Sequence, residues 1–211
     1  MKLQIIILVL FAICTPLQSK NKITVGLKAG CVYHSLSLSR IDMGVNNEDY
    51  PKQLKSPGIV FEFLMEKDIS DQISLISNIS YYKYNSNLRI YQVYEELEHY
   101  NFQMEYIRFP FLVKFHTRRF INPYFLAGIN IGYLLKAQCG LFRNWKIIDI
   151  TKELHRLDGS IDLGFGIPIE CWKFKILYEI RYQIGIRENY YHKIDLGSNR
   201  TFLFIVGIQF N

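Results

Sequence analysis

Hydrophobic and polar residues alternate along most of this chain with a period of two, which is the spacing of a β-strand whose two faces meet different surroundings. The segment 201–211 shows this pattern most clearly. One face carries Phe202, Phe204, Val206, Ile208 and Phe210, and the other carries Thr201, Leu203, Ile205, Gly207 and Gln209. A strand with one wholly apolar face and an aromatic residue beside the end of the chain fits a position between lipid and the interior of a barrel.

The same alternation recurs upstream, in the segments 23–37, 59–65, 73–81, 107–115, 125–136, 161–170 and 174–184. The less apolar face of these segments is rich in glycine and carries few charges, which suits the crowded interior of a narrow barrel. A surface in contact with water would carry lysine and glutamate more densely. We therefore predict an all-β protein that forms an eight-stranded antiparallel transmembrane up-and-down β-barrel. A soluble lipocalin-like cup, apolar inside and polar outside, is the alternative architecture.

The segments between the predicted strands alternate in length. The long, polar ones are Ser39–Ser56, Asn85–Asn101, Gly140–Leu157 and Glu188–Arg200, and the short ones lie near Lys67–Asp71, Thr117–Asn122 and Cys171–Lys173. Outer-membrane barrels have long extracellular loops and short periplasmic turns. The pattern therefore predicts four outer loops, with both termini in the periplasm.

Aromatic residues on the apolar faces sort by strand end. One group consists of Phe63, Phe115, Phe125, Phe174 and Phe210, and the other of Tyr33, Tyr81, Tyr133, Tyr182 and Phe202. Two such rings are typical of the girdles that outer-membrane barrels place at the two lipid–water interfaces. The general preference of strands for aromatic residues is the alternative explanation.

The first residues have the composition of a secretory signal. Lys2 supplies a positive charge, Leu3–Ile13 is apolar, and Leu17–Ser19 fits a cleavage site. We predict a signal peptide at residues 1–19 and a single β-barrel domain at residues 20–211. The predicted location is the cell outer membrane.

Charge and cysteine content exclude several classes of function. The whole chain has a net charge of +6, and removal of residues 1–19 takes away one lysine and no acid, which leaves +5. No run of lysine or arginine concentrates this charge, so no nucleic-acid surface is predicted. Three cysteines remain after the signal, Cys31, Cys139 and Cys171, and an odd number without paired spacing argues against a disulfide framework and a zinc site.

Segments of the second half also carry a family resemblance. They are YIRFPFLVKF at 106–115, PYFLAGINIGY at 123–133, DLGFG at 162–166, YQIG at 182–185 and NRT at 199–201. These segments resemble the strands of the PorT-like family of outer-membrane barrels, a porin-type family common in Bacteroidota-type bacteria. Arg108 stands where that family usually has a glutamate. The resemblance implies an eight-stranded barrel and an accessory role in surface protein secretion.

Charged residues on the inward faces are the first candidate site. They are Lys28, Glu62, Arg108, Lys114, Asp162, Glu170, Glu179 and Arg181. Charges of both signs in a narrow interior must pair, because an unpaired buried charge is very costly. We predict a structural ion-pair network that fills the lumen. A gate whose ion pairs exchange to open a small pore is the alternative.

Tyrosines of the second predicted loop are the other candidate. Tyr84, Tyr91, Tyr94 and Tyr100 lie in or near this loop, and exposed aromatic residues at such density are typical of contact surfaces. They form a candidate partner-contact loop, and the alternative is that they extend the outer girdle.

The sequence contains no recognisable catalytic or metal motif. His34 with Ser35 and Ser37 comes nearest to a Ser–His pair, but adjacent residues of a strand face opposite ways. The histidines His34, His99, His155 and His192 have no metal-motif spacing. We therefore predict no enzyme activity, no metal and no cofactor.

These observations predict an outer-membrane β-barrel protein with a structural or interaction role, and an accessory function in protein secretion on the strength of the resemblance. The predicted partners are outer-membrane lipid and proteins of the envelope or the secretion machinery, with a monomer as the favoured state. The alternatives are a narrow, porin-like diffusion channel and, in third place, an outer-membrane lipid-modifying enzyme.

Overall fold

The computed structural model describes residues 23–36, 40–41, 51–92, 95–117, 122–141, 146–191 and 194–210. The predicted signal peptide, residues 1–19, lies outside these ranges. Among the described residues, no helix has the length and hydropathy needed to cross a membrane.

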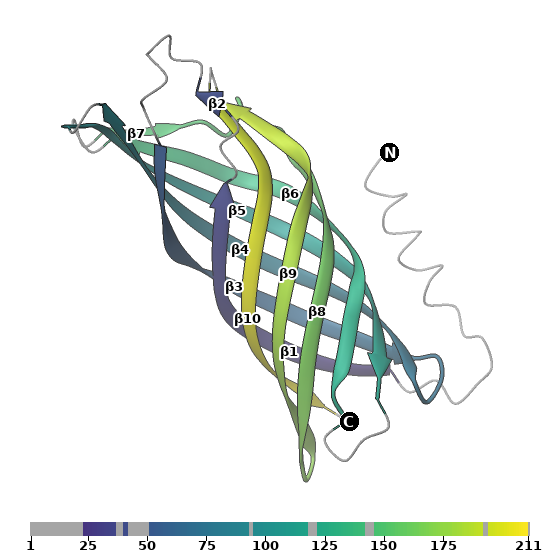
Figure 1. Ribbon diagram of the computed structural model, residues 1–211. Helices are drawn as coiled ribbons and strands as arrows, with labels where there is room; N and C mark the ends of the chain where they lie inside the picture. The colour runs from purple at the N-terminus through teal and green to yellow at the C-terminus, as the bar shows by residue number, and fades with distance from the viewer. Residues whose placement is uncertain are drawn as a thin grey trace, which may run out of the picture.

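Eight long antiparallel strands form a closed barrel (Figure 1). They are β1 (Ile23–Leu36), β3 (Pro51–Asp68), β4 (Ile73–Gln92), β5 (Glu95–His116), β6 (Tyr124–Leu141), β8 (Leu157–Cys171), β9 (Phe174–Tyr191) and β10 (Ile194–Phe210). Each strand pairs with the next in this order, and β1 pairs with β10 to close the sheet. Two short strands, β2 (Arg40–Ile41) and β7 (Lys146–Asp149), pair with β10 and β6. The predicted all-β, eight-stranded antiparallel barrel is confirmed.

Inward and outward side chains alternate along the strands as the hydrophobic pattern predicts. In β10 every second side chain from Thr201 to Gln209 is buried, and those between them are exposed. Phe204 is 48% exposed, whereas its neighbour Leu203 is 0% exposed. An apolar surface turned outward and a packed interior are what a barrel in lipid requires. The aromatic residues of the two predicted girdles lie on this outward face.

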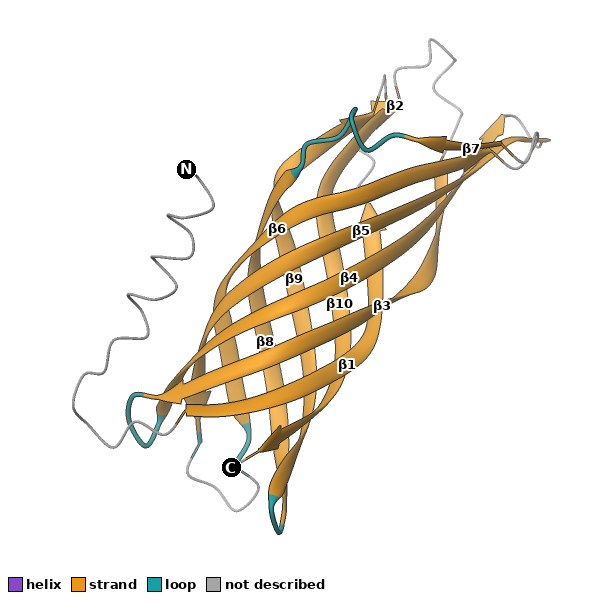
Figure 2. Cartoon of the chain, turned by 180° about the vertical axis from the view of Figure 1, so that it is seen from behind, coloured by secondary structure: helices purple, strands orange, loops and turns teal. Residues whose placement is uncertain are grey.

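The two ends of the barrel differ (Figure 2). At one end, here named the turn end, the connections are residues 69–72, 117–123 and 172–173. Strand β1 begins and β10 ends there, with Val25 opposite Phe210. At the other end, here named the extended end, β3, β4 and β5 run on beyond the start of the β1–β3 pairing at Pro57.

The predicted loops 39–56, 85–101 and 188–200 were wrong in extent, and residues 51–56 of the first of them belong to β3. Asn85–Gln92 continues β4 and pairs with Glu95–Gln103 of β5, so that only residues 93–94 separate these strands. Only residues 192–193 separate β9 from β10. Polar residues on both faces exclude contact with lipid, but they do not prevent neighbouring backbones from pairing. The stretches 85–101 and 188–200 are therefore mostly strand.

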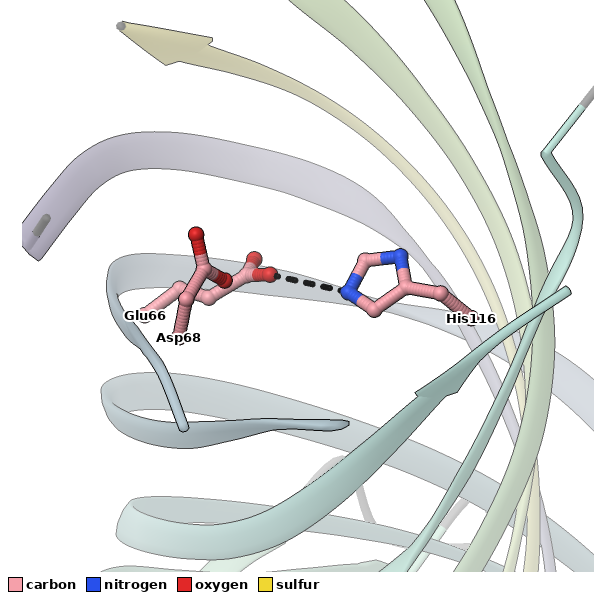
Figure 3. A group of neighbouring side chains, drawn as sticks. All are labelled: Glu66, Asp68 and His116. Carbon is pink, nitrogen blue, oxygen red and sulfur yellow. Dashed lines mark ion pairs between the residues drawn. The ribbon is translucent and has the colours of Figure 1, made fainter. Parts of the chain in front are cut away.

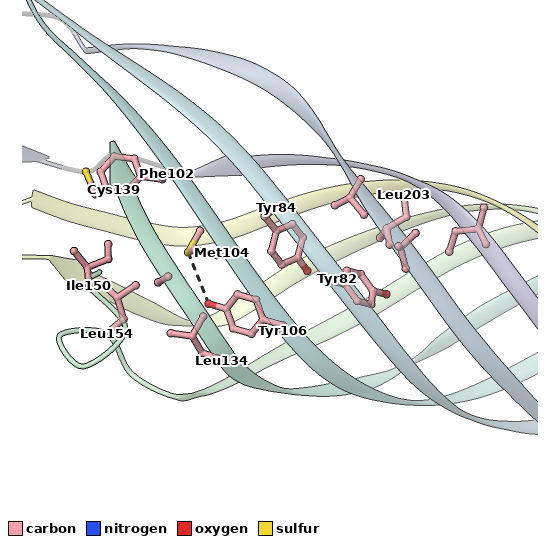
Figure 4. Packing of buried hydrophobic residues seen from close by; sticks show 14 residues of the cluster. Tyr82, Tyr84, Phe102, Met104, Tyr106, Leu134, Cys139, Ile150, Leu154 and Leu203 are labelled. Carbon is pink, nitrogen blue, oxygen red and sulfur yellow. Dashed lines mark hydrogen bonds between the residues drawn. The ribbon is translucent and has the colours of Figure 1, made fainter. Parts of the chain in front are cut away.

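The connection between β6 and β8 packs against the inner face of the barrel at the extended end. Within it, Ile150 and Leu154 are buried, and hydrogen bonds from Thr151 hold the pKa of Asp149 below its usual range. The two apolar side chains join a buried cluster that Figure 4 shows, with Phe102, Met104, Tyr106, Leu134 and Cys139 among its members. This connection thus contributes an apolar layer to the extended end.

Candidate functional site

Polar and apolar layers follow one another inside the barrel. Along β3 the inward residues from the turn end are Glu66, Leu64 and Glu62. Leu64 belongs to an apolar belt, which consists of Leu64, Ile76, Leu112, Tyr124, Leu126 and Leu177. The belt therefore separates charged residues at the turn end from a second charged group in the middle of the barrel.

Four charged residues of alternating sign form the central cluster: Glu62, Arg181, Glu179 and Lys28. The Arg181 guanidinium donates from Nη1 and Nη2 to the two Glu62 oxygens at 3.0 and 3.1 Å, and from Nε to Glu179 at 2.9 Å. Lys28 Nζ lies 2.6 Å from Glu179 Oε1. These side chains are 0–1% exposed. The cluster joins residues of β1, β3 and β9 across the lumen. Removal of any one member would leave a buried charge unpaired, so the contacts among these three strands stabilise the barrel as a unit.

Neutral donors complete the bonding of the two carboxylates in the central cluster. Asn78 Nδ2 and Tyr82 Oη donate to Glu62 at 3.0 and 3.1 Å, and Tyr124 Oη donates to Glu179 at 2.7 Å. Buried carboxylates need several such partners, since Coulomb attraction alone seldom offsets the loss of hydration.

Asp162 is held differently, by neutral groups. Gln183 donates to it at 2.8 Å, Ser160 at 2.9 Å and Asn130 at 3.2 Å. Gln183 also lies 3.3 Å from Tyr82 Oη, which connects Asp162 to the central cluster.

Arg108 occupies the half of the lumen nearer the extended end. Its Nη2 forms an ion pair with Asp158, and its guanidinium carbon lies 5.0–5.7 Å from the ring centres of Tyr82, Tyr84 and Tyr106. Cation–π contacts of this kind offset part of the hydration free energy that the guanidinium loses on burial. The same Arg108 leaves Nε and Nη1 without a hydrogen-bond partner among the described residues.

A second ion pair lies at the turn end. Lys114 Nζ is 2.9 Å from both oxygens of Glu66, and Gln209 Nε2 donates to Glu66 Oε2 at 2.8 Å. Gln209 also donates to Thr24 Oγ1 at 2.7 Å. The Lys114 ammonium lies 4.2 Å from the centre of the Tyr124 ring. This group ties β1, β3, β5 and β10 together where the barrel ends.

Two glycines make room for long side chains that reach across a neighbouring strand. Tyr124, Gly166 and Glu179 lie in one row across β6, β8 and β9, and a Cβ at Gly166 would overlap the Tyr124 ring. Arg108, Gly132 and Asp158 form a similar row, in which a Cβ at Gly132 would lie 3.2 Å from Arg108 Cζ. Glycines on the inner face thus leave the space that Tyr124 and Arg108 need to reach their hydrogen-bond partners.

The eight lumen residues predicted from the sequence do not form one network. Lys28, Glu62, Glu179 and Arg181 belong to the central cluster, and Asp162 is connected to it by Gln183. Arg108 and Lys114 form separate pairs. Glu170 is not in the lumen, because its side chain is 70% exposed beside Lys175, at 3.4 Å. The inward alternation of β8 reaches Glu170 only after the strand has passed the rim of the barrel.

Two ion-pair partners were not predicted from the sequence. They are Glu66, which pairs with Lys114, and Asp158, which pairs with Arg108. Glu66 continues the inward alternation of β3 by one further step, so a longer predicted strand would have included it. Asp158 is the second residue of β8, which begins at Leu157, whereas the hydrophobic pattern predicts a strand only from residue 161. Both residues lie in the parts of β3 and β8 that extend beyond the segments predicted from the hydrophobic pattern.

The tyrosines of the candidate partner-contact loop lie in different places. Tyr84 is 1% exposed, inside the barrel, because the inward phase of β4 continues past Tyr82. It is therefore not available at a surface. Tyr91 and Tyr100 lie in β4 and β5, and Tyr94 lies outside the described residues.

This chain resembles known outer-membrane proteins in sequence pattern and in fold. Residues 17–191 match a family model described as outer membrane protein beta-barrel domain. The fold is similar to Neisserial surface protein A, with a TM-score of 0.53, 12% identity, and coverage of 91% of this chain and 99% of that chain. It is also similar to OprG from Pseudomonas aeruginosa, with a TM-score of 0.50, 8% identity, and coverage of 93% and 100%. No curated protein matches by sequence. At these identities the structural likeness concerns the fold alone.

Proposed function

The chain belongs to the family of outer membrane protein β-barrel domains, and on this premise we propose that it is a closed membrane anchor with a structural or interaction role. The observation that carries the proposal is the central cluster, whose ion pairs run from β1 and β9 to β3 across the lumen. A diffusion channel needs a continuous path of water. Here the middle of the barrel is filled by paired side chains, with the apolar belt next to it.

We expect purified, folded protein in a planar lipid bilayer to show no steady conductance. The reason is that opening a path would require separating Arg181 from Glu62 and Glu179, and the three side chains are only 0–1% exposed. Heat-dependent gel mobility provides the control that the inserted protein is folded. A steady current that rises with salt concentration would contradict the closed anchor and favour the narrow diffusion channel.

The extended end supports an interaction role. Residues 51–56, 85–92 and 95–103 form a three-stranded continuation of β3, β4 and β5. In the orientation that we propose, the turn end and both termini face the periplasm, and this continuation projects from the cell surface. Paired strands hold the backbone in an ordered sheet, so the continuation offers a surface whose backbone needs little further ordering when a partner binds. Tyr91 and Tyr100 lie within it.

The resemblance to PorT-like barrels favours partners from a surface secretion system. We therefore expect a strain that lacks the protein to lose one class of exported cargo from the secreted and surface proteome, with precursors accumulating in the periplasm. A variant without Arg89–Glu98 should insert normally and yet fail to restore secretion, because it lacks the tip of the β4–β5 hairpin. An unchanged proteome in the deletion strain would contradict the secretion role, and full rescue by the shortened variant would contradict docking through this hairpin.

A further inference from the structure

We propose that the turn end holds a binding site for a divalent transition metal ion, formed by Glu66, Asp68 and His116. This inference goes beyond the proposed anchor function and departs from the sequence-based prediction of no metal, which considered other histidines. It rests on how the ends of β3 and β5 lie beside one another at the rim of the barrel.

The three side chains converge although two strands supply them. Glu66 and Asp68 are successive inward-phase positions at the end of β3, and His116 is the last residue of β5. One ligand atom from each lies within 4.8 Å of the other two. His116 Nε2 is 3.7 Å from Glu66 Oε1, and Figure 3 shows the imidazole turned toward both carboxylates.

Strand β4 lies between β3 and β5, and it contributes the residue that holds the three side chains in place. Ser74 Oγ donates to Asp68 Oδ1 at 2.6 Å and lies 2.8 Å from His116 Nε2. The hydroxyl thus links a carboxylate and an imidazole in the space between them. With an ion bound, the same hydroxyl can keep its hydrogen bond to Asp68, which is the support that ligating carboxylates usually have.

The distances fit a bound ion after small side-chain rotations. A zinc ion binds oxygen and nitrogen ligands at roughly 2.0–2.2 Å in a tetrahedron, so its ligand atoms lie about 3.4 Å apart. The present separations of up to 4.8 Å exceed this by an amount that rotation of the Asp68 side chain, which is not buried, can supply. His116 is partly exposed, with 26% of its side chain accessible, and an ion can therefore enter from the turn end.

Lys114 is the internal competitor of the ion. Its ammonium now lies against both oxygens of Glu66, where it supplies the positive charge that this buried carboxylate requires. In the same position the ammonium also lies 4.2 Å from the centre of the Tyr124 ring, a contact that does not depend on Glu66. Two carboxylates face one lysine here, and an ion that binds Asp68 and His116 therefore adds positive charge to a site with a surplus of acid.

The donor set indicates the class of metal. Imidazole nitrogen with two carboxylate oxygens suits zinc and neighbouring first-row divalent ions, whereas calcium and magnesium prefer oxygen ligands alone. Three protein ligands leave one tetrahedral position for water. Bound in this way, the ion would connect β3 to β5 at the rim.

The test is a calorimetric titration in which Zn²⁺ is added to the full, untagged, folded protein in detergent. We expect one ion per chain for the unaltered protein, and a loss of affinity of at least about tenfold in both Asp68→Asn and His116→Gln. Asp71→Asn removes the same charge from the turn that follows β3 and serves as the matched control for Asp68→Asn, and His155→Gln serves as the control for the histidine. Both controls should bind Zn²⁺ like the unaltered protein.

Failure of the unaltered protein to bind Zn²⁺ would overturn the proposal, and so would unchanged affinity in Asp68→Asn. Asp68 is not buried, and asparagine can still accept the Ser74 hydrogen bond, so this variant is expected to fold normally by heat-dependent gel mobility. Zn²⁺ should also raise the unfolding temperature of the unaltered protein and not that of Asp68→Asn. Lys114→Met should bind the ion more tightly, and unchanged affinity there would overturn the competition by lysine.

Discussion

Replacing Arg181 by methionine is expected to lower the free energy of unfolding by about 3–5 kcal/mol, the range for breaking a buried ion pair by removing one partner. Methionine fills a similar volume, so the loss comes from charge. Glu62 would lose its two-pronged hydrogen bond, and Glu179 would keep Lys28 and Tyr124 alone. A denaturant titration of the protein in lipid vesicles measures this difference. The free energy of unfolding should depend on denaturant concentration with the same slope in both proteins, and only the midpoint should shift.

The control for Arg181→Met is Lys175→Met, which breaks the exposed ion pair with Glu170. This change is expected to cost less than about 1 kcal/mol, because water and salt screen an exposed pair. Equal losses in the two variants would show that the central cluster does not hold the barrel together. Adding Glu62→Gln to Arg181→Met should recover part of the loss, since it removes one of the carboxylates left without its partner.

Replacing Gly166 by alanine is the second change with a large expected effect. The new methyl group would overlap the Tyr124 ring, and the tyrosine would have to move away from Glu179. Overpacking of this kind costs about 1–3 kcal/mol. Loss of a hydrogen bond to a charged group adds roughly 1.5–3 kcal/mol. We expect both terms to appear as a lower free energy of unfolding.

Gly159, on the same strand, provides the matched control. A Cβ there would have Ile186 Cδ1 as its nearest neighbour, at 3.8 Å, which is an ordinary contact. Gly159→Ala should therefore be neutral or stabilise the strand slightly, because alanine restricts the unfolded chain more than glycine does. A similar stability of the two alanine variants would contradict the proposal that Gly166 leaves the space that the Tyr124 ring occupies. Adding Tyr124→Phe to Gly166→Ala tests whether the two positions act together.

The sequence by itself determined the architecture of this protein. The period of two is a local property, because successive side chains of a strand face opposite ways wherever the strand lies. Segments such as 201–211 could therefore be assigned an apolar outer face and a small or polar inner face. Eight such segments with turns between them predict closure, since a sheet in lipid cannot leave its edge unpaired. The family match and the strand order agree with that prediction.

The limits of this pattern lie where lipid ends. Apolar alternation stops at the edge of the lipid-facing band, whereas backbone pairing continues. The sequence therefore predicted loops where β4 and β5 are paired up to Gln92 and Glu95. For the same reason it placed Tyr84 at a surface, although the strand continues and turns this side chain inward.

Only the tertiary structure decided which inward charges meet. The inner face of a strand can be read from its own residues, but the partner across the lumen depends on the register of all the strands between. Arg181 thus lies between Glu62 and Glu179, whereas Glu170 passes beyond the rim. Convergence of Glu66, Asp68 and His116 likewise depends on where β3 and β5 end relative to one another. Register is set by the closure of the whole barrel, which no local spacing in the sequence contains.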